Sequence, residues 1–125
     1  MKTSILLAAW YVCAVVLFPG TVLANKSAVS IEAPPTAARG SEVVITLTVT
    51  HNANSTFHYT NWVRLDVDGK MVDKWEYTKD NRPDGATFKK EIKVTVTGTT
   101  ELVAEANCNR HGSAGAAKAV IKVQE

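Results

Sequence analysis

Alternation of apolar and polar or β-branched residues along several short segments is the feature that most constrains this fold. A period of two places successive side chains on opposite faces of an extended chain, and β-branched residues favour that conformation. The pattern recurs in residues 58–67 and 87–96. It is clearest in residues 41–50, where one side carries Val43, Ile45, Leu47 and Val49. The sequence therefore predicts half-buried strands with one face against a core.

Turn signals separate these segments and fix the expected fold class. Asp68-Gly69 favours a tight hairpin turn, and the segment NRPDGA at 81–86 is a loop rich in turn residues. Further strands are expected at residues 28–33, 71–77, 101–108 and 117–123. Short strands at this spacing, with no convincing helical segment, are typical of an all-β fold. We predict a seven-stranded immunoglobulin-like antiparallel sandwich or barrel.

The first 24 residues have a different pattern from the rest of the chain. Lys2 precedes an apolar run from Ile5 to Phe18, and a small-residue site ends at Ala24. This order is typical of a secretory signal peptide cleaved after Ala24. A membrane anchor is the alternative, but the run is shorter than the about 20 residues of a spanning helix. We therefore expect residues 1–24 to be removed and residues 25–125 to form one domain, exported to the periplasm and free of the membrane.

Charge excludes some partner classes. Removing Lys2 from the 14 basic residues leaves 13 against 12 acidic ones, a net charge of +1. Because no basic stripe or clustered charge run is present, nucleic acid and anionic membranes are not expected partners. A small-molecule substrate and self-association into a homo-oligomer both remain compatible with this composition.

Cys108 is the only cysteine in residues 25–125, because Cys13 lies in the predicted signal peptide. It therefore has no partner for an internal disulfide, although exported domains of this size often carry disulfides. Three interpretations remain open: a buried inert thiol, a thiol bonded to a partner, or a thiolate that binds a metal.

The three histidines, His51, His58 and His111, lie at expected junctions between strands and loops, as does Cys108. If these junctions fall at the same end of a sandwich, three imidazoles and one thiolate surround one point. Such a donor set suits iron, copper or zinc and disfavours magnesium or calcium. Each residue alone is compatible with an ordinary surface or core role. Together they favour a metal site, but they do not identify the metal.

Two motifs resemble those of a known family. The segment CNRHG at 108–112 resembles the C-N-x-H-G signature of the superoxide reductases, the desulfoferrodoxin and neelaredoxin family. The segment HNANSTFHYTNW at 51–62 is similar to that family's first-His, second-His-Tyr and Trp segment, and PDGATF at 83–88 is also similar. The resemblance covers about residues 40–113 and implies a seven-stranded immunoglobulin-like barrel with a mononuclear non-haem iron.

The resemblance also implies roles for individual residues. His51, His58 and His111 match equatorial imidazole ligands, and Cys108 matches the axial thiolate, which takes part in catalysis. The implied reaction is one-electron reduction of superoxide to hydrogen peroxide, with an electron donor that the sequence does not name. Backbone N–H groups near Asn109 and Arg110 are expected to donate hydrogen bonds to the sulfur of Cys108 and so to tune the reduction potential of the metal.

The sequence also departs from the family pattern. The family supplies a fourth equatorial histidine and a neighbouring lysine from an early loop, but the corresponding residues 31–40 contain neither. Arg39 could replace the positive charge, although we interpret it as a solvated loop residue. The alternative function is therefore a non-catalytic metal-binding or electron-transfer module with a His₃Cys zinc or copper site. A third hypothesis is a binding protein without metal, whose cysteine pairs with a partner.

Overall fold

The computed structural model describes residues 26–52 and 54–125. Within these ranges the chain forms strands and no helix, so none of the described residues forms a helix that could cross a membrane. The predicted signal peptide lies outside the described residues. The strands are β1 (Ala28–Glu32), β2 (Thr36–Ala38), β3 (Ser41–Thr50), β4 (Thr60–Val67), β5 (Lys70–Glu76), β6 (Thr87–Val96), β7 (Thr100–Cys108) and β8 (Ala117–Gln124).

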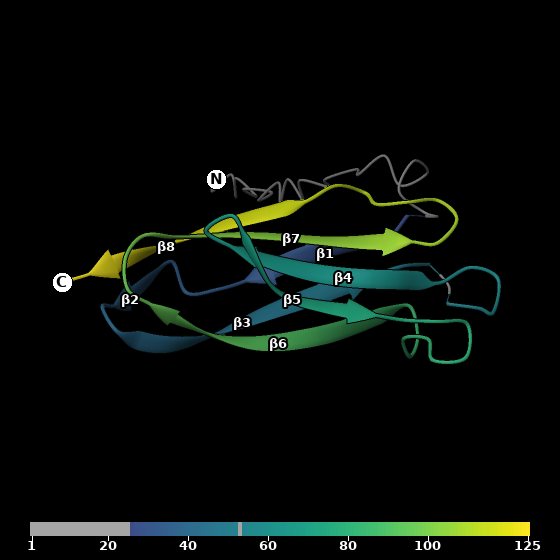
Figure 1. The fold of residues 1–125 in the computed structure, drawn as a ribbon, viewed down its shortest axis with the longest axis horizontal. Coiled ribbons are helices and arrows are strands. Elements are labelled where there is room, and N and C mark those ends of the chain that lie inside the picture. The colour runs from purple at the N-terminus through teal and green to yellow at the C-terminus, as the bar shows by residue number, and fades with distance from the viewer. Residues whose placement is uncertain (1–25, 53) are drawn as a thin grey trace, which may run out of the picture.

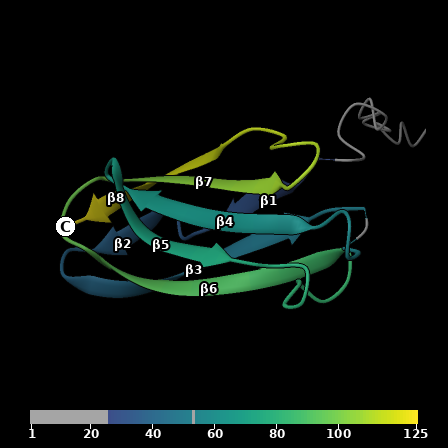
Figure 2. The ribbon, with the colours of Figure 1, turned by 45° about the vertical axis from the view of Figure 1, so that its right-hand side comes forward.

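The strands form two layers that face each other (Figures 1 and 2). One sheet has the order β1-β3-β6 and the other the order β2-β8-β7-β4-β5. The all-β prediction and the immunoglobulin-like sandwich are therefore confirmed. The two sheets of the described chain do not close into a barrel, so the barrel alternative is wrong.

The described residues form eight strands rather than the predicted seven, and the additional one is β2. This strand has three residues, which is too short to show alternation, and it follows Pro34 and Pro35. It pairs with β8 in parallel, whereas all the other strand pairs in the described residues are antiparallel. Strand β2 is therefore identified only by its pairing with β8, which the sequence pattern does not indicate.

The core lies between the two sheets and is built from the predicted alternation. Most inward residues of β3, β4 and β7 are fully buried, and β6 and β8 contribute one such residue each. Transfer of an apolar side chain of this size from water into the core contributes about 1.5–3 kcal/mol to the stability of the fold. The fully buried core side chains include Ile45, Leu47, Val49, Val63, Leu65, Val96, Leu102 and Ile121.

One end of this sandwich collects the segments that carry the histidines and the cysteine. Strands β3 and β7 end there and β4 begins there, on the right-hand side of Figure 1. Arg39 lies at the opposite end, at the start of β3, where its guanidinium pairs with Glu125 and donates to the carbonyl of Thr97. A strand of ten residues spans about 33 Å. Arg39 therefore cannot replace the missing lysine, in agreement with its interpretation as an exposed loop residue.

Candidate metal centre

The four predicted ligands come from three different places in the chain and meet at this end of the sandwich. His51 directly follows β3, His58 precedes β4 by two residues, Cys108 is the last residue of β7, and His111 lies in the turn after it. Strands β4 and β7 are neighbours in one sheet, while β3 belongs to the other. The structure thus brings together all four residues, including one that reaches across the two layers.

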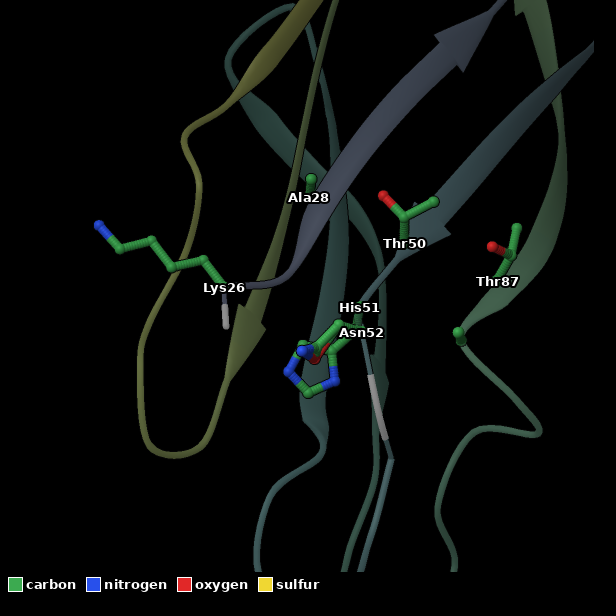
Figure 3. A pocket seen from close by; sticks show the side chains of 7 residues that line it. Lys26, Ala28, Thr50, His51, Asn52 and Thr87 are labelled. Carbon is green, nitrogen blue, oxygen red and sulfur yellow. The ribbon is translucent and has the colours of Figure 1, made fainter. Parts of the chain in front are cut away.

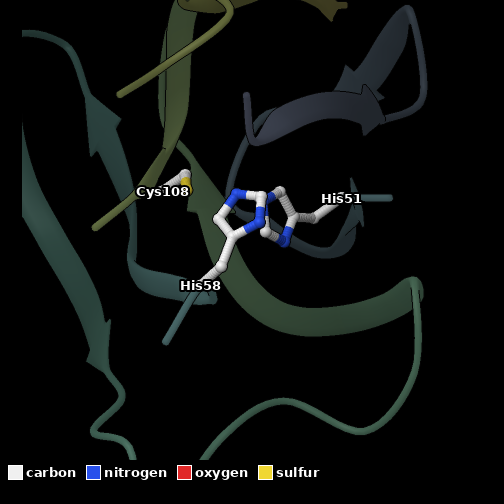
Figure 4. Close-up of side chains that lie close together, drawn as sticks. All are labelled: His51, His58 and Cys108. Carbon is white, nitrogen blue, oxygen red and sulfur yellow. The ribbon is translucent and has the colours of Figure 1, made fainter. Parts of the chain in front are cut away.

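The donor atoms of these residues are close to one another, and Figure 4 shows the arrangement of His51, His58 and Cys108. His51 Nε2 lies 3.0 Å from His58 Nε2, which in turn lies 2.9 Å from His111 Nδ1. Cys108 Sγ lies 3.8 Å from His111 Nδ1. The ligand atoms of His51, His58 and Cys108 all lie within 4.8 Å of one another. The cluster is therefore compact enough to surround a single ion.

The chemistry of these contacts fits a cation. His58 Nε2 meets a ring nitrogen on either side, and a nitrogen carries either one proton or one lone pair. It therefore cannot form a full hydrogen bond with both neighbours. Two nitrogen ligands held about 2.1 Å from one ion lie about 3.0 Å apart at a right angle and about 3.4 Å apart at a tetrahedral angle. The observed spacings are close to the right-angle value, so the residues present fit a metal.

Burial differs strongly across the cluster. Cys108 is 1% exposed and His51 is 3% exposed, whereas His58 is half-buried and His111 is exposed. The sulfur side of the site is therefore sealed by the core, and the His111 side faces solvent. A small solute can approach the cluster from this open side.

A tight turn sets the separation of Cys108 and His111. The backbone N–H of Cys108 donates to the carbonyl of Gly112, and the N–H of Gly112 donates to the carbonyl of Cys108. Gly112 has a φ of 80°, a conformation that residues with a Cβ adopt at a cost. Ser27 anchors the turn through bonds to the backbone of Gly112 and Ala114. The glycine of the CNRHG motif is thus required by the turn.

A clasp between two loops holds His58. The N–H of Asn109 donates to the carbonyl of Tyr59 at 3.0 Å, and the N–H of Tyr59 donates to Asn109 Oδ1 at 3.0 Å. Arg110 Nε donates to the carbonyl of Phe57 at 2.6 Å. The clasp fixes the backbone on both sides of His58. Because the N–H of Asn109 is directed at Tyr59, the expectation that it donates to the sulfur is wrong.

A hollow of about 370 Å³ lies beside His51 (Figure 3). Its lining includes Lys26, Thr50 and Asn52, so a lysine contributes to the same end of the sandwich as the histidines. Lys26 was not predicted from the sequence because it precedes β1 and lies far from the motifs. Asn54, whose carboxamide contacts His51, was not predicted either.

Comparisons with known proteins agree with this arrangement. Residues 21–114 match the family model described as desulfoferrodoxin. A variant of superoxide reductase (neelaredoxin) from Ignicoccus hospitalis has 23% sequence identity and a TM-score of 0.66, over 81% of this chain and 83% of that chain. Superoxide reductase (neelaredoxin) from the same organism has 21% identity and a TM-score of 0.62, over 79% and 82%.

A different kind of protein shares the fold. The CARDB domain of a Pyrococcus furiosus protein, in complex with di-metal ions, has 14% identity and a TM-score of 0.59, over 78% of this chain and 91% of that chain. The comparison with curated proteins found no match. At these identities the structural likeness establishes the fold, and the family model carries the assignment.

Proposed function

Because the chain belongs to the desulfoferrodoxin family, we propose that it is a mononuclear iron protein that reduces superoxide to hydrogen peroxide. The observation that carries this proposal is the meeting of three imidazoles and one thiol at a single point with one side open to solvent. Cys108, His51, His58 and His111 are the proposed ligands.

The proposed reaction needs one electron and two protons for each superoxide. Ferrous iron held by these donors would supply the electron, and the protons come from solvent. Cys108 places a soft, negatively charged donor at the buried side of the site, where the core excludes water. The three imidazoles are neutral donors that add no further negative charge. The chain therefore combines one anionic ligand with neutral ones, and it leaves the exposed side for the substrate.

Access and charge favour a small anion. The exposed His111 leaves the cluster open to solvent on one side. Lys26 lines the hollow beside His51, and Arg110 is an exposed cation in the His111 turn. Cations near a site raise the local concentration of an anion such as superoxide and increase its association rate.

A closed zinc or copper site without turnover is the second candidate, because the family's fourth histidine is missing from residues 31–40. Three histidines and one cysteine are the donor number of a structural zinc site. His111 is exposed rather than enclosed, and this exposure favours the open iron site.

Export to the periplasm by a cleaved signal peptide belongs to the same proposal. It is supported by the order of charged, apolar and small residues in 1–24. The electron donor is then a periplasmic reductant.

The test is to purify residues 25–125, load them with ferrous iron without oxygen, and measure iron content and superoxide consumption. We expect one iron per chain and consumption that is lost in Cys108→Ser. An Arg39→Ala variant is the matched control, because Arg39 lies at the other end of the sandwich. Stoichiometric zinc that iron does not displace, without superoxide consumption, would favour the closed site.

A further inference from the structure

The carboxamide of Asn54 is fixed in orientation by two backbone groups. The N–H of Thr60 donates to Asn54 Oδ1 at 2.9 Å, and Asn54 Nδ2 donates to the carbonyl of Gly85 at 2.6 Å. A backbone N–H can only donate and a carbonyl can only accept. The two ends of the amide are therefore distinguished by their partners, and the opposite orientation would place like groups together at both ends.

This orientation determines the tautomer of His51. His51 Nδ1 lies 3.1 Å from Asn54 Oδ1, which is an acceptor. The ring nitrogen must therefore carry the proton and donate it. In a neutral imidazole the other nitrogen then carries the lone pair. That nitrogen, Nε2, is the one that faces His58 Nε2 at 3.0 Å.

We propose that Asn54 is a positioning residue that holds His51 in the Nδ1–H tautomer and directs its Nε2 lone pair at the metal. Metal-ligating histidines commonly donate their second ring N–H to an oxygen acceptor, and this bond fixes the ring and raises its basicity. In this protein the acceptor is the amide oxygen of Asn54. This inference rests on the proposed metal site, but it does not depend on which metal binds or on superoxide turnover.

The same side chain joins three segments around the site. Asn54 belongs to the loop between β3 and β4, Thr60 is the first residue of β4 and is fully buried, and Gly85 lies in the loop before β6. Asn54 therefore ties the loop that carries His58 to both sheets. Its loss would affect metal binding through His51 and could also loosen this loop, so the test must separate the two effects.

The first measurement needs no variant. Long-range ¹H–¹⁵N NMR correlations of the metal-free wild-type domain identify the ring tautomer of His51 at a pH where its ring is neutral. We expect the proton on Nδ1. A predominant Nε2–H tautomer would overturn the proposal, whether or not the protein binds metal. Failure of the domain to bind any metal, with Nδ1–H observed, would instead contradict the proposed function.

The second measurement compares the affinity of three proteins for Co²⁺ in competition with a chelator at fixed pH. Asn54→Asp retains the oxygen acceptor and loses the donor to Gly85, whereas Asn54→Ala loses both. We expect Asn54→Ala to bind about 10- to 100-fold more weakly than wild type, and Asn54→Asp to recover most of that loss. Equal weakening in both variants, or none in Asn54→Ala, would overturn the proposal, because a purely structural role depends equally on the bond to Gly85.

Discussion

His58 Nε2 and His111 Nδ1 lie 2.9 Å apart, although 53 positions separate the two residues in the chain. The contact results from the pairing of β4 with β7, which aligns the residues that precede one strand with those that follow the other. The clasp at Asn109 and the turn at Gly112 then fix the two loops. The cluster thus lies at the paired ends of two interior strands, and its exposed half can be changed without altering the core.

Replacing Cys108 with serine tests the thiolate ligand. A hydroxyl is a harder and weaker donor than a thiolate, so we expect the sulfur-to-metal charge-transfer band of the Co²⁺ or ferric form to disappear. Absorption spectra of the loaded wild-type and Cys108→Ser domains provide the measurement. An unchanged band would mean that the sulfur does not bind the metal.

Replacing His111 with alanine should weaken metal binding without unfolding the protein. His111 is exposed, so its truncation removes little buried surface and should change the free energy of unfolding by less than about 0.5 kcal/mol. Loss of a ligand should lower metal affinity by at least about tenfold. Urea denaturation of the metal-free protein and a chelator competition give the two values. Wild-type affinity in His111→Ala would remove His111 from the ligand set.

Gly112→Ala tests the strain in the motif turn. Gly112 has a φ of 80°, and an alanine there should cost about 1–2 kcal/mol of stability. Gly98→Ala is the matched control, because Gly98 has an ordinary φ and nothing within 4 Å of an added Cβ. Urea denaturation should show a loss for the first variant and little change for the second. Equal stabilities would show that the turn does not need glycine.

Asn109→Ala tests the clasp on His58. The variant loses the acceptor for the N–H of Tyr59 and the weaker bond to Phe57, which together contribute about 1–2 kcal/mol. Metal affinity should fall with stability, since the loop of His58 loosens. Asn81→Ala, at another exposed loop asparagine, is the control. The clasp has no role if the two variants behave alike in urea denaturation and in chelator competition.

Lys26→Glu tests the electrostatic contribution at the hollow beside His51. Reversing this charge should lower the rate of superoxide consumption about 2- to 10-fold at low ionic strength, and added salt should reduce the difference. Arg39→Glu reverses a charge at the far end and should have a much smaller effect. A salt-independent loss in Lys26→Glu would point to a structural role instead.

The strands and the cluster of histidines and cysteine could be predicted from the sequence because each leaves a local signal. Alternation in residues 41–50 identified β3 and its inward face, and the CNRHG segment placed Cys108 and His111 in one turn. Strand β2 was not accessible, because three residues carry no period and their pairing with β8 is long-range. Whether the strand ends that carry these residues meet depends on the order of the strands in the sheets. The sequence did not predict that order, so it predicted a cluster only if these strand ends fall at the same end of the sandwich.

The residues around the cluster were harder to predict than the cluster itself. Asn54 contacts His51 and Lys26 lines the hollow beside it, and asparagine and lysine are common in loops for other reasons. The donors to the sulfur were predicted wrongly at Asn109, since its N–H is committed to the clasp on Tyr59. Motifs name the groups that perform chemistry, whereas positioning contacts depend on how loops from different strands meet.

We propose that this chain reduces superoxide by one electron at an iron site held by His51, His58, His111 and Cys108. The most direct test is to mix a known pulse of superoxide with the ferrous-loaded domain and to measure the products. We expect one hydrogen peroxide to form for each superoxide consumed, no dioxygen to evolve, and the reaction to stop when the superoxide consumed equals the bound iron. Dioxygen evolution with continued turnover, or spontaneous decay alone, would contradict it.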